Sequence, residues 1–163
     1  MNRLRAIQIG VIGPAGLDDA TSRAAERVGE LIAREGAVLV CGGLGGAMEA
    51  AARGAVSAGG MTLGILPGAS ADDANPYIKT VVVTDMGHAR NAIVVRSSDA
   101  VIAVGGGYGT LSEIALAMKC GIPVVGLNTW RASRGDGLKA PTLTAATPEE
   151  AVEKAISAAR GRA

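Results

Sequence analysis

The chain has 163 residues and a net charge of +1, and 48% of its residues are hydrophobic although only 2% are aromatic. This length suits one domain, 1–163, with a sizeable core, and the small net charge provides no basic field for nucleic acid or an anionic membrane. No apolar run approaches the roughly 20 residues of a membrane span. We therefore expect a cytoplasmic protein with neither a nucleic-acid nor a membrane partner.

The predicted elements alternate between short apolar runs and helical patterns. Six predicted strands cover residues 7–12, 37–41, 61–66, 80–84, 100–104 and 123–127. The predicted helices cover about 18–35, an Ala-rich segment ending near 57, 88–97, 110–120 and a last segment that starts with a capping box at Thr147. Residues 131–141 are predicted to be a mobile loop. Nearly all-apolar strands separated by helices are typical of a parallel sheet covered on both faces. We therefore predict an α/β, Rossmann-like three-layer α/β/α fold with a mainly parallel, doubly wound sheet of about six to seven strands.

The cysteines and the single His limit the metal chemistry. Cys41 and Cys120 do not form a Cys-x-x-Cys pair, and the sequence contains one His. A zinc site needs more soft ligands than this, and isolated cysteines in the cytoplasm stay reduced. We expect no metal site and no resident cofactor.

Glycine-bearing turns follow four of the predicted strands, at residues 13–16, 42–46, 67–68 and 105–109. In a parallel sheet these turns meet at the carboxyl edge, where ligands bind. The spacing Gly10-x-x-Gly13-x-x-Gly16 is a weak dinucleotide fingerprint, because no acidic residue ends the second strand to hold a ribose. The sequence also lacks a Gly-Lys-Ser/Thr phosphate loop. The turns therefore favour a mononucleotide or a sugar phosphate held mostly by backbone groups.

The segment 99–113 is the most informative, because an apolar run stops at three glycines before a predicted helix. Residues 105–110 read Gly-Gly-Gly-Tyr-Gly-Thr, and Glu113 follows three residues later. Such a junction directs backbone N–H groups and the positive end of the helix dipole at one point, which suits a phosphate. The alternative is that Thr110-x-x-Glu113 is only a capping box. That alternative explains Thr110 and Glu113 but not the preceding glycines and tyrosine.

A second polar segment, His88-Ala89-Arg90-Asn91, precedes the glycine strand and should open on the same edge of the sheet. Arg90 can pair with a phosphate or a base through two parallel hydrogen bonds. The alternative is a solvated Arg90, with His88 as an ordinary residue at a helix N-terminus. This segment alone leaves both interpretations open.

These two segments, together with residues 42–48 (Gly-Gly-Leu-Gly-Gly-Ala-Met), resemble the LOG-like family of Rossmann-like proteins over roughly residues 5–128. Members of that family act as phosphoribohydrolases, which release the base and ribose 5-phosphate from a nucleoside 5′-monophosphate. The resemblance implies that Arg90 and Glu113 are catalytic. The residues expected to bind the phosphate or nucleotide are Gly13, Gly42, Gly43, Gly46, Met48, Arg90, Gly105, Gly106, Gly107, Tyr108, Gly109 and Thr110.

Three positions depart from the LOG-like pattern. Gly105 replaces a proline, Asn91 replaces a lysine, and Ser112 stands where an acid is common. With these changes the chain resembles a short sub-branch related to the molybdenum cofactor carrier proteins, which bind an anionic pterin phosphate without turning it over. A carrier or binding protein is therefore the alternative to a hydrolase.

The two functions assign different roles to the same residues. In a hydrolase, Glu113 holds the ribose hydroxyls or orients the attacking water, and Arg90 stabilises the departing base or the ribose. In a carrier, Arg90 neutralises the phosphate and Glu113 mainly caps its helix. Asp85 is the only other acid predicted near this edge. A nucleotide-binding sensor is a third alternative, whereas a pyridoxal-dependent decarboxylase is not expected because no lysine lies at a glycine turn.

The expected partner is a small phosphorylated ligand, either a nucleoside monophosphate or a pterin phosphate. LOG-like proteins form dimers, and the predicted helix 88–98 is apolar on more than one side. We therefore expect a homodimer in which helices 88–98 and 110–120 contribute to the interface.

Overall fold

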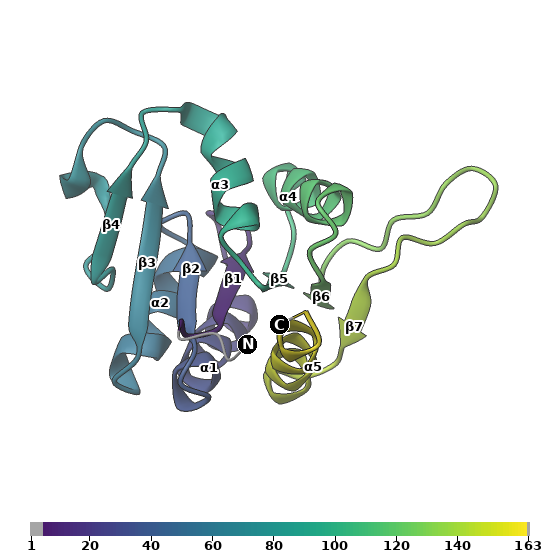
Figure 1. The fold of residues 1–163 in the computed structure, drawn as a ribbon, viewed down its shortest axis with the longest axis horizontal. Helices are drawn as coiled ribbons and strands as arrows, with labels where there is room; N and C mark the ends of the chain where they lie inside the picture. Colours follow the sequence, from purple (N-terminus) through teal and green to yellow (C-terminus); the bar gives the residue numbers. More distant parts are fainter. Residues whose placement is uncertain (1–4, 163) are drawn as a thin grey trace.

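The computed structural model describes residues 5–162, which form a seven-stranded sheet with all strands parallel (Figure 1). The strand order is β4-β3-β2-β1-β5-β6-β7. The strands are β1 (Gln8–Ile12), β2 (Val38–Cys41), β3 (Met61–Leu66), β4 (Thr80–Val83), β5 (Ala100–Val104), β6 (Val124–Leu127) and β7 (Leu143–Ala145). The predicted Rossmann-like α/β fold is confirmed.

Helices cover both faces of the sheet. α1, α2 and α5 pack on one face, and α3 and α4 lie together on the other (Figure 1). The α-helices of the described part are α1 (Asp19–Arg34), α2 (Ala47–Ser57), α3 (Asn91–Arg96), α4 (Tyr108–Lys119) and α5 (Pro148–Arg160), and short 3-10 helices cover Ala71–Asp73 and Gly87–Arg90. Within residues 5–162, none of these helices has the length and apolar character needed to cross a membrane.

The core contains aliphatic and small side chains, because the sequence has no Phe. β5 is buried along its whole length, as expected for a central strand covered on both faces. α1 and α2 pack closely because glycines stand at their contact. A Cβ on Gly29 would lie 1.8 Å from the carbonyl oxygen of Ala51, and a Cβ on Gly54 would lie 1.9 Å from that of Glu26. This contact fixes α2, and with it the glycine turn that precedes α2.

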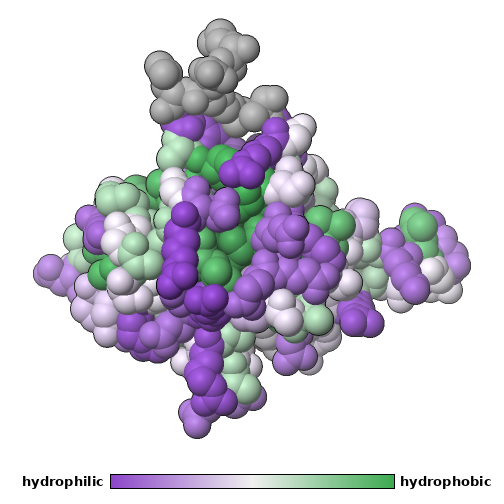
Figure 2. All heavy atoms as spheres, turned by 90° about the horizontal axis from the view of Figure 1, so that it is seen from below, coloured by the Kyte–Doolittle hydropathy of each residue, from purple (hydrophilic) through white to green (hydrophobic). Residues whose placement is uncertain are grey.

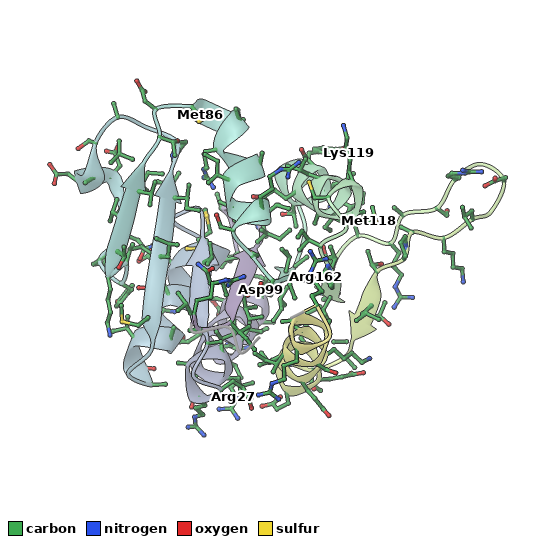
Figure 3. All side chains as sticks on the ribbon, viewed as in Figure 1. Arg27, Met86, Asp99, Met118, Lys119 and Arg162 are labelled. Carbon is green, nitrogen blue, oxygen red and sulfur yellow. The ribbon has the colours of Figure 1, made fainter. Side chains whose placement is uncertain are left out.

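The carboxylate of Asp99 ties the amino ends of β1 and β5 together. It accepts hydrogen bonds from the Arg5 guanidinium at 2.6 and 2.9 Å and from the Gln8 backbone N–H at 2.9 Å. In Figure 3 Asp99 lies near the middle of the view, well below Met86, which lies at the upper edge. β1 and β5 are therefore held side by side, with their carboxyl ends at the upper edge.

The order of the strands reverses between β1 and β5. Successive strands after β1 extend the sheet in one direction as far as β4, and β5 starts a second series in the other direction. In open α/β sheets, ligands bind in the crevice outside the carboxyl ends of the strands at such a reversal. The glycine turns after β1, β2 and β5 surround this point, so the fold places three predicted turns together.

Several element boundaries differ from the predictions. β7 was not predicted, because three residues are too few for a pattern, and it forms because the edge of β6 is available for pairing. The helix predicted over 88–97 begins as the 3-10 turn Gly87–Arg90, and α4 begins at Tyr108 rather than Thr110. Residues 131–141 belong to an arm that extends away from the sheet (Figure 1), with an antiparallel bridge between Ser133 and Lys139.

Candidate functional site

A cavity of about 310 Å³ opens at the carboxyl edge where the strand order reverses, and we call it the switch-point cavity. Its walls come from the turns after β1 and β2, the 3-10 turn before α3 and the first turns of α4. Its volume falls at the lower end of the range of about 300 to 1,000 Å³ that is usual for small-molecule sites. The lining residues are Val11, Ile12, Gly13, Pro14, Ala15, Gly42, Met48, His88, Arg90, Asn91, Gly107, Gly109, Thr110 and Glu113.

The structure brings some of the predicted site residues into this cavity and places others outside its lining. Those in the lining are Gly13, Gly42, Met48, Arg90, Gly107, Gly109, Thr110 and Glu113. Those outside it are Gly43, Gly46, Gly105, Gly106 and Tyr108. The cavity therefore contains both residues predicted to be catalytic.

Three of the glycines outside the lining shape the turns around the cavity. Gly43, Gly46 and Gly105 have φ angles of 76°, 69° and 65°, a region that favours glycine. A Cβ on Gly46 would also lie 2.4 Å from the carbonyl oxygen of Pro14. Gly46 therefore allows the turn before α2 to approach the turn after β1.

Gly106 and Tyr108 lie beside Trp130. A Cβ on Gly106 would lie 2.7 Å from Cδ1 of the indole, so only glycine leaves room for this ring. The Trp130 Nε1–H donates a hydrogen bond of 3.0 Å to the Gly107 carbonyl oxygen. The ring centroids of Tyr108 and Trp130 are 5.9 Å apart, and 84% of Tyr108 is exposed. The turn before α4 thus carries a fixed aromatic pair.

α4 is capped by a different pair of residues than the sequence suggested. Its N-cap is Gly107, and the Thr110 hydroxyl accepts a hydrogen bond of 3.4 Å from the Gly107 backbone N–H. Glu113 is therefore one turn farther along the helix and does not cap it. The interpretation of Thr110-x-x-Glu113 as a capping box is wrong, because α4 begins two residues before Thr110. Glu113 faces the switch-point cavity instead.

Arg90 is buried with only 7% of its surface exposed, and its guanidinium packs flat against Gly42. A Cβ on Gly42 would lie 2.0 Å from Nη1 of Arg90, so a side chain there would displace the guanidinium. Nε of Arg90 is buried and has no hydrogen-bond partner within residues 5–162. Burial lowers the pKa of Arg90, and Glu113 and Cys41 partly oppose this. Arg90 is therefore a buried cation that lines the cavity and has an unsatisfied Nε within the described residues.

Glu113 is 8% exposed and faces the same cavity. Burial raises the pKa of Glu113 from 4.5 to about 7, although the positive charge of Arg90 acts in the opposite direction. In the described part of the chain, no hydrogen bond or ion pair to this carboxyl group is present. A carboxyl group with such a pKa can accept or donate a proton near neutral pH.

Two helix N-termini with glycine at the N-cap lie next to this pair of charges. α2 and α4 have glycine at the N-cap, Gly46 and Gly107, and neither N-cap provides a side-chain hydrogen bond. The first N–H groups of a helix have no acceptor within the helix, and they carry the positive end of its dipole. The Ala47 N–H at the start of α2 already donates a hydrogen bond of 3.1 Å to the Pro14 carbonyl oxygen. Arg90 and the N-terminus of α4 are therefore the groups that make the cavity suited to an anion.

Sequence reasoning missed some of the lining residues. Pro14 and Ala15 line the cavity, and their position directly after Gly13 at the end of β1 was the available signal. His88 and Asn91 were recognised as part of a polar segment but were not assigned to the site. Asp85 lies outside the lining, on an exposed turn with a φ of 52°.

A larger cavity of about 540 Å³ lies between α1 and α5. Leu31, Val152 and Ile156 form part of its walls, and charged residues surround them. Figure 2 views this lower end of the molecule, where hydrophobic surface lies between hydrophilic side chains. The C-terminal part of α1 lies at the amino edge of the sheet, so this cavity is remote from Arg90 and Glu113. Residues 5–162 contain no group of three or more His, Cys, Asp or Glu side chains arranged for a metal ion.

Known proteins with similar sequences include one full-length and one partial match. The chain is 50% identical over 159 residues to an uncharacterized protein of Archaeoglobus fulgidus, and the match covers 94% of this chain and 97% of that protein. It is 39% identical over 88 residues to the cytokinin riboside 5′-monophosphate phosphoribohydrolase LOG5 of Arabidopsis thaliana. That second match covers 52% of this chain and 38% of the plant protein.

Solved structures of molybdenum cofactor proteins are similar along nearly the whole chain. The molybdenum cofactor binding protein of Rippkaea orientalis superimposes with a TM-score of 0.85 at 38% identity, covering 95% of this chain and 98% of that one. A molybdenum cofactor carrier protein of Chlamydomonas reinhardtii gives 0.84 at 34% identity, with 98% and 100% covered. The model of the SLOG cluster4 family matches residues 6–156. The chain therefore belongs to the SLOG cluster4 family, a LOG-like family, as its glycine and arginine motifs indicated.

Proposed function

We propose that the protein binds the phosphate group of a small ligand in the switch-point cavity, and that it carries the molybdenum cofactor as its cargo. The single observation that supports binding is the buried Arg90, whose Nε has no hydrogen-bond partner within residues 5–162, beside the N-terminus of α4, whose N-cap is glycine. The choice of cargo rests on the similarity to a molybdenum cofactor binding protein and a carrier protein over nearly the whole chain.

The cavity is better suited to binding a ligand than to catalysing its conversion. A pterin phosphate is anionic, and Arg90 supplies the charge that it needs, while the backbone N–H groups of α4 supply hydrogen bonds without a side chain that could react. Because Arg90 is already buried against Gly42, little side-chain entropy is lost when it pairs with the ligand. A carrier requires such a preorganised binding site.

The test compares two arginines on neighbouring turns. Arg90→Met should lower the affinity for anaerobically isolated molybdenum cofactor by about 10- to 100-fold, because it removes a buried charge whose Nε forms no hydrogen bond in the described part of the chain. Arg96→Met is the control, since Arg96 is exposed at the end of α3. Equilibrium dialysis measures both affinities. Equal affinity for the two variants would contradict the proposal.

A second candidate function, nucleoside 5′-monophosphate phosphoribohydrolase activity, is favoured by Glu113. This carboxyl group does not cap α4, faces the cavity and has a pKa of about 7. In that reaction Glu113 would take a proton from the attacking water or hold the ribose hydroxyls, and the bond between the anomeric carbon and the base would break through an oxocarbenium-like state. Phosphate binding would supply the energy that positions the sugar.

Base release from AMP tests this second function. Chromatography of AMP incubated with the wild type should detect free adenine, and Glu113→Gln should abolish it. Glu49→Gln is the control, because Glu49 belongs to the first turn of α2 but does not line the cavity. Absence of base release from every nucleoside monophosphate tried, with cofactor binding intact, leaves the carrier function alone. In either case we propose a single domain over 1–163 that acts in the cytoplasm.

A further inference from the structure

A second polar cavity lies at the same edge of the sheet, beside the carboxyl ends of β6 and β7. It has a volume of about 290 Å³. We call it the Trp130 cavity, and the residues of its lining that matter here are Asn128, Thr129, Trp130, Thr142 and Thr144. None of them lines the switch-point cavity.

The two cavities are neighbours across the turn that begins α4. Gly107 lines the switch-point cavity, and its carbonyl oxygen accepts the hydrogen bond from Nε1 of Trp130, which lines the other cavity. Gly106 lies under both Trp130 and Thr129, since a Cβ there would be 2.7 Å from Cδ1 of the indole and 3.2 Å from Oγ1 of Thr129. A ligand with its phosphate at the start of α4 therefore needs to cross only this turn to reach Trp130.

Four polar side chains of the Trp130 cavity form no hydrogen bond within the described residues. Oγ1 of Thr129 is buried and forms no hydrogen bond in the described structure. Among residues 5–162, no hydrogen bond is present to the side chains of Asn128, Thr142 or Thr144 either. Asn128 also has a φ of 51°, a conformation that asparagine tolerates better than most residues. Asn128 and Thr144 are exposed and can bond water, whereas the buried Oγ1 of Thr129 cannot. An unpaired buried group lowers stability, so the fold gains nothing from the Thr129 hydroxyl by itself.

An aromatic face next to unpaired hydroxyl and amide groups has the chemistry of a site for a planar heterocycle. The face stacks on a flat ring, and the amide and hydroxyls match the alternating donors and acceptors on the edge of such a ring. The sequence has one Trp, two Tyr and no Phe, and Trp130 and Tyr108 lie together at this turn. This scarcity makes the aromatic pair beside the turn a distinct feature of the chain.

We propose that the Trp130 cavity binds the nitrogen heterocycle of the ligand, a pterin or purine ring, with Trp130 as the stacking face and Thr129 as a hydrogen-bonding partner. The phosphate stays in the switch-point cavity. The inference deepens the proposed function, and it rests on that function only for the phosphate-bearing half of the ligand.

Ring compounds without a phosphate group test the ring-binding half of the site separately from the phosphate-binding half. Isothermal titration calorimetry with pterin and with adenine should detect binding to the wild type, and the stronger of the two identifies the ring class. Trp130→Leu should weaken ring binding by about 5- to 100-fold, because base–aromatic stacking is lost. Trp130→Phe keeps a flat face and should retain most of the affinity. Arg90→Met should weaken binding of inorganic phosphate while it leaves ring binding in place.

Thr129→Val gives a readout that a structural role would not produce. The substitution removes a hydroxyl that has no partner, so the thermal midpoint of the free protein should stay the same or rise, while ring affinity falls by about 2- to 10-fold. A lower midpoint would show that the hydroxyl serves the fold, and the proposal would fail.

Two further results would contradict the proposed ring site and leave the proposed phosphate site standing. One is ring binding that Arg90→Met abolishes and Trp130→Leu leaves unchanged, which places the ring in the switch-point cavity. The other is no ring binding by the wild type, together with an unchanged affinity of Trp130→Leu for the phosphorylated ligand. The proposed function fails separately, if neither inorganic phosphate nor the cofactor binds.

Discussion

At the level of single residues, Arg90 and Glu113 are opposite charges that face one cavity without forming an ion pair in the described structure. Burying a charge without a partner costs free energy. Burial consequently disfavours the charged form of each group, lowering the pKa of Arg90 and raising that of Glu113. The pair therefore lowers the stability of the free protein, and a bound anion would supply the partner that Arg90 lacks.

Glu113→Gln should remove a pH dependence of the free energy of unfolding. The pKa of Glu113 is raised from 4.5 to about 7, so the folded protein binds this proton more tightly than the unfolded chain does. Its contribution to stability is complete below the unfolded pKa and is lost as the pH rises through the folded pKa. The variant should therefore match the wild type near the unfolded pKa and exceed it above the folded pKa, by at most about 3 kcal/mol.

Urea denaturation of both proteins over a series of pH values measures this difference. Glu49→Gln serves as the control, because Glu49 does not line the cavity. Curves of stability against pH that run parallel for Glu113→Gln and the wild type would refute the raised pKa.

Gly42→Ala should weaken phosphate binding because the new methyl group occupies the place of the Arg90 guanidinium. The Cβ would lie 2.0 Å from Nη1 and 2.6 Å from Cζ of Arg90. We expect a loss of about 10-fold or more in affinity for inorganic phosphate, since charge-assisted hydrogen bonds depend strongly on geometry. Gly45→Ala in the same turn is the matched control, because its nearest neighbour would be Oε2 of Glu49 at 3.7 Å. Equal affinities for the two variants would disprove this role of Gly42.

At the level of elements, the contact between α1 and α2 depends on glycine inside a helix. Gly29→Ala improves helix propensity by about 1 kcal/mol, but its Cβ would lie 1.8 Å from the Ala51 carbonyl oxygen. We expect a net destabilisation of about 1–3 kcal/mol from overpacking. Gly109→Ala in α4 meets nothing within 4 Å and should stabilise slightly. Chemical denaturation measures both changes, and a gain in stability for Gly29→Ala would contradict the observed packing.

At the level of the whole molecule, the face that carries α3 and α4 has less helical cover than the opposite face (Figure 1). Val82 pairs with Ile65, which belongs to the core under α3 and α4, and Val82 is 41% exposed. A contiguous apolar surface that helices leave uncovered is typical of an interface. We expect the predicted homodimer to have its contact on this face.

Sedimentation equilibrium tests this dimer. The wild type should sediment as a dimer at micromolar concentration, and Val82→Lys should shift it toward the monomer. Val83→Lys is the control, because Val83 is similarly exposed, at 44%, but the next residue of a strand faces the opposite side. A wild type that sediments as a monomer would contradict this prediction.

The sequence predicted the fold from features that are local. Apolar runs such as residues 100–104 and the glycine turns that follow them identify parallel strands and their carboxyl ends, because burial on both faces demands such runs. The same reasoning predicted that Arg90 and Glu113 lie at the carboxyl edge of the sheet. It did not detect β7, which is only three residues long and depends on the free edge of β6.

Local patterns by themselves thus determined the succession along the chain of the helices and of the first six strands, the fold class, and the edge of the sheet where the candidate site lies. Only the tertiary structure decided that α4 begins at Tyr108, which frees Glu113 from capping, that Arg90 packs on Gly42, and that Trp130 lies on Gly106. The physical reason is that propensity and hydrophobic period act over a few neighbouring residues. Contacts between residues far apart in the chain depend instead on strand order, on the rotation of each helix and on the space that a missing side chain leaves.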